Sequence, residues 1–385
     1  MPKMEVYGSQ LQWARRHRNL TIAQAAKAIG ITKSELKSYE DGSVKPDLGK
    51  VRKMGRVYTF PMVTFFLPNP PANLPSYTED FRTVGGAVPD LSVDTLTIIG
   101  RIRAYQTKMA QIFESDDKFF APFSPRYDIE KDPCAQAIIE RHRLSITLKD
   151  QLAWHDEDDA FRKLRAILED HGVYVYMEKL SIDECRGISI LDHPKLPAII
   201  VNKDKGKEPV AAKIFTLAHE YAHVLIGRPG ISDFNHRNRV ERFCNRFAAA
   251  FLAPEEAIRK VLTPFPKGVV DWEPDQIRTI ARTLKISQQA TALRLEELGL
   301  AREGFFASFK EGQQKRGGRK KNDRSVKIPQ ATLRLYSLGR RMPTAVISAL
   351  DRGVISAVDA TRILNVRSDT VTKMREKLGI QIHRQ

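Results

Sequence analysis

The sequence LAHEYAHVLI, residues 217–226, determines how the rest of the chain is interpreted. Residues four positions apart on an α-helix point about 40° apart around its axis, so His219 and His223 share one face on consecutive turns. Two imidazoles in this arrangement can bind one zinc ion. Glu220 follows the first histidine, where its carboxylate can accept a proton from an attacking water. The spacing predicts a metal-binding helix; the alternative is a core helix whose histidines are satisfied by hydrogen bonds.

A catalytic zinc ion needs a third protein ligand and keeps one position open for water. The segment 241–254, ERFCNRFAAAFLAP, has helical periodicity, and its small Ala248 and Ala249 allow another helix to approach closely. Glu241 begins this helix and can face the two histidines, so it is the expected donor. A cysteine three residues later is more simply explained as a small core side chain. The alternative ligands in sequence terms are Asp233, His236 and Cys244.

Short apolar runs precede the metal-binding helix at residues 173–176, 187–191 and 198–201. They are rich in Val, Ile and Tyr and are separated by polar or proline-containing stretches, which predicts strands of a small sheet. Helical periodicity comes before them at 160–169 and after them from 210 to 298. The central part is therefore predicted to be α+β, with a sheet of three strands or slightly more.

The N-terminal part carries a helix-turn-helix pattern. Thr21 to Gln24 reads as a capping box that opens a helix through Ala28, and Gly30 breaks that helix. Residues 32–35 read as a second capping box, which opens a helix through Tyr39. Two short helices joined by a glycine-containing turn are typical of this motif.

The second helix of such a motif enters the major groove with its N-terminal residues forward. Gln24, on the first helix, could reach a phosphate or a base edge. The alternative is that the motif makes only protein contacts. The outward residues of the second helix, and hence the expected DNA contacts, are Thr32, Lys33, Ser34 and Lys37.

Charge is distributed unevenly over the 385 residues, whose net charge is +17. Residues 1–60 carry 12 Lys and Arg against 5 Asp and Glu, and residues 310–385 carry 18 against 6. The part between them is nearly neutral. Two basic ends favour an anionic partner such as nucleic acid, although basic ends can also simply aid solubility.

Composition also predicts the domain boundaries. Four prolines between residues 67 and 75 indicate a stiff linker, and the Lys- and Arg-rich stretch 310–327 a flexible one. The expected domains are an all-α helix-turn-helix domain at 1–67, the α+β domain at 76–309, and an all-α helical domain at 328–385.

Two later segments also have helix-turn-helix spacing. Residues 275–298 have nearly balanced charge, so structural packing is the expected role. In the C-terminal domain, Ser356 caps a helix through Leu364, and a second helix covers 368–378. For this pair, DNA binding and a dimer or partner contact remain equally open.

Several classes of protein are excluded by the sequence. It has no run of about 18 apolar residues, so no transmembrane helix is expected. The N-terminus has no apolar signal core, and the three cysteines form no CxxC pair. The expected location is a reducing cytoplasm, with no membrane partner.

HEYAH followed by E-x-x-x-N-x-F-A-A-x-x-L-x-P resembles the ImmA/IrrE family of metallopeptidases, and the resemblance extends over about 160–300. It implies a zincin-like α+β fold in which His219, His223 and Glu241 bind Zn²⁺ and Glu220 is the general base. Residues 8–60 resemble the lambda-repressor-like family, and the fusion of the two is itself a known architecture. The chain departs from the peptidase pattern at Tyr221 and Cys244, and neither departure removes a functional group.

This resemblance implies a DNA-binding transcriptional regulator with a gluzincin-like zinc endopeptidase that hydrolyses a regulatory partner protein, for example a repressor. The alternative is an antitoxin or repressor of a toxin–antitoxin-like operon whose peptidase fold binds a partner without turnover. Expected partners are operator DNA and a regulatory or toxin protein encoded nearby, and a homodimer is possible. Candidate oxyanion donors are Tyr221, His236 and Arg242.

Overall fold

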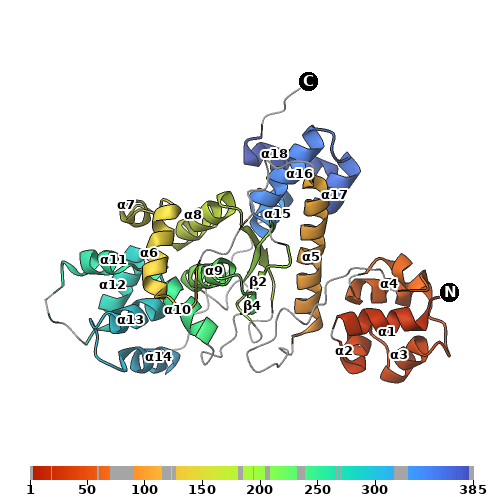
Figure 1. The fold of residues 1–385 in the computed structure, drawn as a ribbon, viewed down its shortest axis with the longest axis horizontal. Coiled ribbons are helices and arrows are strands. Elements are labelled where there is room, and N and C mark those ends of the chain that lie inside the picture. The colour runs from red at the N-terminus through yellow and green to blue at the C-terminus, as the bar shows by residue number, and fades with distance from the viewer. Residues whose placement is uncertain are drawn as a thin grey trace. The chain divides into compact units, whose positions relative to one another are not determined.

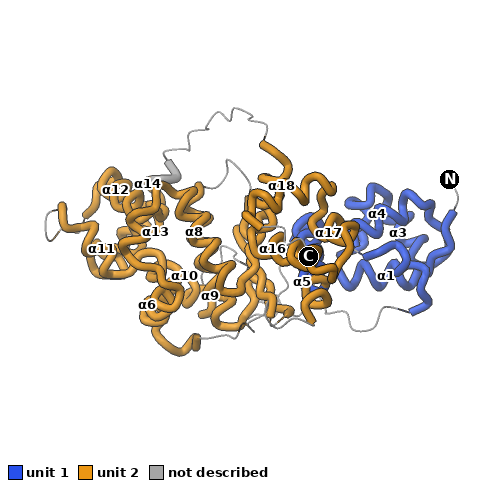
Figure 2. Tube along the Cα trace, turned by 90° about the horizontal axis from the view of Figure 1, so that it is seen from above, with its two compact units in different colours: residues 1–107 blue, residues 108–385 orange. Residues whose placement is uncertain are grey.

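The computed structural model describes residues 3–18, 20–58, 60–69, 91–114, 123, 127–180, 185–193, 195–203, 209–231, 239–265, 268, 271–315 and 328–380. The chain divides into two compact units, residues 1–107 and 108–385, which Figure 2 colours separately. Within the described ranges, no helix combines the length and the apolar character needed to cross a membrane.

Unit 1 is a bundle of short helices around one apolar core. Its elements are α1 (Gly8–His17), α2 (Ile22–Ile29), α3 (Lys33–Glu40), α4 (Leu48–Tyr58) and the 3₁₀-helix η1 (Met62–Phe66). The long helix α5 (Val93–Phe113) crosses the boundary between the units, and its first turn packs on this core through Val93 and Leu96. The core residues are Leu11, Ala14, Leu20, Ala25, Ala26, Ile29, Leu36, Tyr39, Val51, Met54, Tyr58 and Phe65.

The predicted helix-turn-helix forms with one difference in its caps. Thr21 and Gln24 make the complete capping box, and α2 ends at Gly30, whose φ of 78° is left-handed. Thr32 caps α3 by accepting from the backbone N–H of Glu35 at 3.1 Å. The reciprocal half of the second box was predicted wrongly: the Glu35 carboxylate accepts instead from the Tyr39 hydroxyl, at 2.5 Å, and from Lys50. An ammonium partner held by a neighbouring helix attracts the carboxylate more strongly than a single peptide N–H does.

Unit 2 contains a four-stranded sheet in the order β1-β3-β2-β4. The strands are β1 (Tyr174–Glu178), β2 (Gly187–Ile190), β3 (Ala198–Asn202) and β4 (Gly230–Ile231). β1 runs parallel to β3, and the other pairs are antiparallel. The three predicted strands are confirmed, and the two-residue β4 is the small extension of that sheet.

Helices cover both faces of the sheet, as Figure 1 shows for α8 (Glu157–Asp170) and α9 (Val210–Leu225) on one side and α15 (Gln330–Leu338) on the other. On the second side, the hydroxyl of Tyr176 lies 3.6 Å from the sulfur of Met342 on α16 (Arg341–Asp351). The guanidinium of Arg341 lies 5.2 Å from the ring centre of Tyr174. β1 is therefore buried on both faces, which suits its continuous apolar and aromatic sequence.

Polar contacts also join the C-terminal helices to the sheet and its neighbours. Buried Arg165 donates to the carbonyl of Tyr336 at 2.6 Å, and Glu169 accepts from the backbone N–H of Arg340 at 2.8 Å. Residues 328–380 thus complete the second face of the sheet in unit 2, while residues 91–107 belong with unit 1. Of the predicted linkers, residues 70–75 and 316–327 lie outside the described residues, while residues 310–315 are helical and form the end of α14 (Phe305–Lys315). The domain boundaries at 67–76 and 309–328 stay a prediction.

The remaining helices of unit 2 surround its main core. They are α6 (Pro133–Arg143), α7 (Leu148–Leu152), α10 (Arg239–Leu252), α11 (Glu255–Leu262), α12 (Pro274–Leu284), α13 (Gln288–Glu297) and α14 (Phe305–Lys315). α12 and α13 contribute Ile277, Ile280 and Leu295 to that core, which matches the packing role expected for this segment. The last two helices, α17 (Ala357–Leu364) and α18 (Ser368–Leu378), have the predicted bounds to within a residue.

Candidate functional site

The predicted metal-binding helix is α9, and it lies in the core of unit 2. It begins after Pro209, which supplies a helix-compatible φ and has no N–H to leave unsatisfied. His219, Glu220 and His223 are 4%, 0% and 1% exposed. The candidate chemical groups are therefore shielded from bulk water, where charge interactions are strong.

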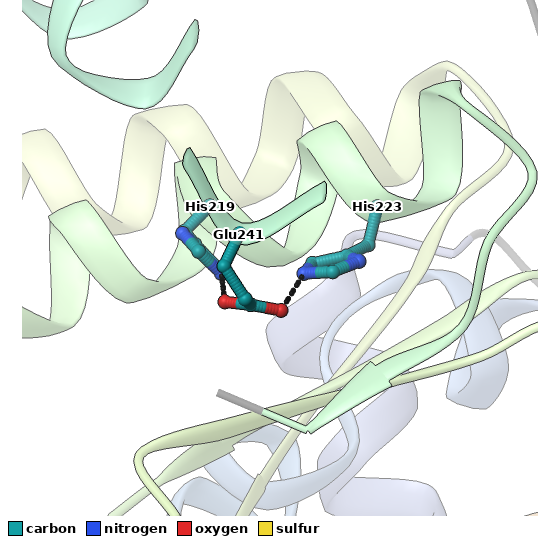
Figure 3. A group of neighbouring side chains, drawn as sticks. All are labelled: His219, His223 and Glu241. Atoms are coloured by element: carbon teal, nitrogen blue, oxygen red, sulfur yellow. Dashed lines mark ion pairs between the residues drawn. The ribbon is translucent and has the colours of Figure 1, made fainter. Parts of the chain in front are cut away.

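Glu241, in the first turn of α10, meets both histidines of α9 (Figure 3). Its two carboxylate oxygens lie 3.2 Å from His219 Nε2 and 3.1 Å from His223 Nε2. One ligand atom from each residue lies within 4.8 Å of those of the other two. The structure brings together the three residues that the sequence assigned to metal binding.

The geometry of these groups fits a metal ion better than a hydrogen-bonded cluster. Both Nε2 atoms are buried, and neither makes a hydrogen bond, despite their short distance to Glu241. His223 Nδ1 lies 3.1 Å from the carbonyl oxygen of Arg228, which can only accept, so Nδ1 carries a proton and Nε2 is the nitrogen left to bind an ion. With a cation bound, the Nε2 lone pair would point at it. A backbone carbonyl behind a histidine is the usual support of a zinc ligand, and two histidines with one glutamate are a known catalytic ligand set.

The electrostatics of the site also favour a cation. Burial lowers the pKa of His223, but Cys244, Glu241 and Glu220 raise it by more, so that it lies well above its ordinary value. Burial raises the pKa of the Glu241 carboxyl, but His219 and His223 lower it by more, to well below its usual range. The carboxylates of Glu241 and Glu220 are the negative groups beside His223, and a divalent cation would balance them.

Two glycines that the sequence analysis did not single out give the site its shape. A Cβ atom at Gly230 would lie 2.5 Å from Cε1 of His223. One at Gly187 would lie 2.6 Å from Cγ2 of Thr216 and 2.8 Å from a carboxylate oxygen of Glu220. Gly230 is held there by its N–H, which donates to the Ser189 hydroxyl at 2.8 Å. The backbone of β4 therefore packs on the imidazole, and that of β2 on the candidate base. A glycine within a predicted strand, as in 187–191, is the signal of close backbone approach that could have found Gly187.

Tyr221 faces away from the candidate ligands. Its hydroxyl donates to buried Glu140 on α6 and accepts from Arg143 at 2.8 Å. Burial, followed by the nearby Glu140, raises the pKa of Tyr221 well above its ordinary value. Residues two apart on a helix point in nearly opposite directions, so the histidine face cannot also present this hydroxyl. Tyr221 holds α9 against α6, and this geometry gives it no place as an oxyanion donor.

The other sequence candidates are placed as follows. Cys244 is fully buried and influences His223, but it is outside the three-residue ligand group. Arg242 is exposed on α10. Asp233 and His236 lie outside the described residues.

The candidate DNA-binding face is the outer side of α3. Thr32, Lys33, Ser34 and Lys37 are all exposed, while Leu36 is fully buried beneath them. The Thr32 and Ser34 hydroxyls lie 3.0 Å apart. The residues predicted to read DNA thus share one accessible face, and their contacts with DNA stay a prediction.

Gln24 has a local structural role on α2. Its side-chain oxygen accepts from both the backbone N–H and the hydroxyl of Thr21, each at 2.9 Å. A DNA contact by Gln24 also stays a prediction, and it would have to coexist with this cap.

Comparison with known proteins bears on both parts of the chain. Residues 168–296 match the family model of the IrrE N-terminal-like domain (peptidase M78), and residues 6–63 match a family model described as a helix-turn-helix domain. Both resemblances inferred from the sequence are thereby confirmed. A search of curated proteins gave no match. Among solved structures, PlcR of Bacillus thuringiensis, in complex with the peptide PapR7 and DNA, is similar over 98% of this chain and 94% of its own, with 12% identity and a TM-score of 0.17.

Proposed function

We propose that this chain, a fusion of a helix-turn-helix domain with an IrrE-like peptidase M78 domain, is a DNA-binding regulator that hydrolyses a partner protein in a zinc-dependent reaction. The observation that carries the proposal is the convergence of His219 and His223 of α9 with Glu241 of α10. The exposed hydroxyl and ammonium groups of α3 support the DNA-binding part. The cytoplasm, where DNA is accessible and thiols stay reduced, is the proposed location.

The roles of the residues follow from their placement. His219, His223 and Glu241 would hold the ion through Nε2, Nε2 and a carboxylate oxygen. Zinc, when bound, supplies Lewis-acid polarisation of the scissile carbonyl and lowers the pKa of the attacking water. Glu220, next to the first ligand, accepts the proton of that water and returns it to the leaving amine. Its burial against β2 at Gly187 fixes the carboxylate and keeps bulk water away from it.

The decisive experiment compares the wild type with Glu220→Gln on the products of neighbouring genes, with casein as a general substrate. Zinc content is measured for both proteins in parallel. We expect about one zinc per chain in both and specific cleavage of a neighbouring gene product only by the wild type, with a loss of about 10²–10⁴-fold in the variant. Equal cleavage by both proteins contradicts the role of Glu220. Efficient casein digestion with the neighbours left intact contradicts a dedicated partner.

The same experiment separates the non-catalytic alternative. A neighbouring gene product that binds tightly to both proteins and is cleaved by neither indicates an antitoxin or repressor that captures its partner. In that case the zinc content distinguishes partner binding at a metal-loaded site from partner binding by a domain that holds no metal.

A further inference from the structure

The turn between α2 and α3 is repeated, with the same residue spacing, between α17 and α18. Both first helices have eight residues and open with a complete capping box, Thr21 with Gln24 in one and Ser356 with Asp359 in the other. In both, the second helix begins three residues after the cap that ends the first. The two pairs therefore share the length and start of the first helix and the connection to the second, while α18 has 11 residues and α3 has 8.

The backbone of the two turns also agrees. Gly30 and Asn365 both have a left-handed backbone, with φ of 78° and 50°. The residue after each, Ile31 or Val366, donates its N–H to the carbonyl five residues earlier, at 3.0 and 3.1 Å. The inward side chains are buried at matching positions, namely Ala25 and Ala360, Ile29 and Leu364, Leu36 and Val371, and Tyr39 and Met374.

The turn alone does not indicate DNA binding, because it occurs twice more in unit 2. The non-glycine residues with positive φ in the described part of the chain are Ser145, Lys285 and Asn365, and all three occupy such turns. Seven residues after Ser145 and Lys285, where α3 has Lys37, stand Leu152 and Ala292. These two side chains pack into the main core.

At this position, α18 differs from α7 and α13 in the same way that α3 does. The position that matches Lys37 is Thr372, which is exposed. Its neighbours on the outer side are exposed as well and include three bases, a hydroxyl and two acids: Arg367, Ser368, Asp369, Lys373, Glu376 and Lys377. Asp369 and Lys373 lie 3.6 Å apart, and both side chains remain more than 60% exposed.

The chemistry of this face suits the major groove. Lys and Arg contact phosphates and guanine, hydroxyls contact phosphates or bases, and a carboxylate accepts from the amino group of cytosine. Arg362, exposed on α17, adds a fourth base beside the turn. Arg375, on the other side of α18, donates to Asp351. This basic residue therefore stabilises the fold and is not part of the exposed face.

We infer that α17 and α18 form a second helix-turn-helix, which binds double-stranded DNA with α18 in the major groove. This reader belongs to the same compact unit as the candidate metal centre. DNA bound by α18 would hold that unit at a locus whether or not α3 binds DNA. The inference goes beyond the proposed function and depends neither on hydrolysis nor on α3.

The test uses the full chain and a labelled random-sequence duplex of about 30 base pairs, titrated at several salt concentrations. The variant Arg367→Ala/Lys373→Ala/Lys377→Ala removes three exposed charges from α18 and its N-cap. The matched control, Lys149→Ala/Lys260→Ala/Arg282→Ala, removes three exposed charges from α7, α11 and α12. Both are also made in a Lys33→Ala/Lys37→Ala background, which weakens the N-terminal reader.

We expect the α18 variant to bind about tenfold more weakly than the control and to show a salt slope smaller by two to three, about one per lost phosphate contact. In the Lys33→Ala/Lys37→Ala background, the remaining duplex binding should disappear when the α18 variant is added and persist when the control variant is added. Thr372→Glu, a single exposed change, should give a similar loss and replaces the triple variant if that protein unfolds.

Equal affinity and salt slope in the α18 variant and the control would overturn the inference. It would also be overturned if the α18 variant keeps its DNA affinity but no longer self-associates in sedimentation, because the face would then be a protein interface. Failure of the N-terminal reader or of peptidase activity shows in Lys33→Ala/Lys37→Ala and Glu220→Gln instead, so the failures are distinguishable.

Discussion

α9 and α3 carry the two halves of the proposed function, and they place their functional side chains in opposite environments. On α9 the functional groups are almost completely buried and are held by a carbonyl, two glycine backbones and a second helix. On α3 the functional groups are exposed, and only the opposite face is fixed. A metal site needs fixed ligand positions, which the surrounding groups secure, whereas a DNA reader needs access. Substitutions of the groups that support α9 should therefore change the metal site, whereas on α3 only substitutions of the exposed side chains themselves should change DNA binding.

The largest expected effect is loss of metal from α9. His219→Ala/His223→Ala removes two of three ligands, so zinc should fall from about one per chain to none. Elemental analysis after dialysis measures it, with Glu220→Gln as the control that keeps all three ligands. Full zinc occupancy in the double variant would show that the ion binds elsewhere.

The next largest effect concerns the buried end of α3. Arg15 makes two hydrogen bonds to Glu40, at 2.6 and 2.7 Å, and both side chains are less than 10% exposed. Glu40→Ala leaves a buried guanidinium without its counter-ion, which should cost about 3–5 kcal/mol of stability in unit 1. Hydrogen exchange of α1–α4 measures this free energy separately from unit 2.

Glu35→Ala is the matched control for that variant. It breaks the more exposed pair with Lys50, whose contribution should be below about 1 kcal/mol. Similar protection factors in the two variants would mean that burial does not distinguish these ion pairs.

A smaller effect should separate the two glycines around α9. Gly230→Ala places a methyl group against the His223 ring and should weaken zinc binding by about 10–100-fold, the range for a disturbed ligand support. Gly187→Ala presses on Thr216 and Glu220 instead, so it should lower hydrolysis and leave zinc affinity nearly unchanged. Competition with a chelating dye measures the affinity. The same zinc affinity in both variants would refute the separate roles assigned to β4 and β2.

The smallest effect is expected on α3. Lys33→Ala/Lys37→Ala removes two exposed ammonium groups that do not pack in the core. The free energy of unfolding should therefore stay within about 0.5 kcal/mol of the wild type. Duplex affinity should fall about tenfold, with a smaller salt slope. The control Arg52→Ala/Arg56→Ala removes equal charge from exposed positions of α4. Equal losses in both would indicate a general charge effect and not a reading helix.

The sequence determined those features that depend on local chemistry. Thr21, Gly30 and Thr32 mark the ends of α2 and α3 because capping and left-handed turns use neighbouring residues only. His219 and His223 had to share a face once the segment was helical, since helix geometry alone fixes it. The strands of the sheet were visible for the same reason, as β-rich runs between breaks. These predictions needed no knowledge of distant parts of the chain.

Only the tertiary structure decided which distant groups meet. It brought Glu241 to the histidines, turned Tyr221 toward Glu140, and set Gly187 and Gly230 against the site. It also distinguished two repeats of one turn: α13 is buried by its neighbours and α18 keeps an open face. The local sequences of those turns are alike, and the difference lies in what packs on the second helix. Packing depends on the sum of weak contacts across elements far apart in sequence, so no local pattern contains it.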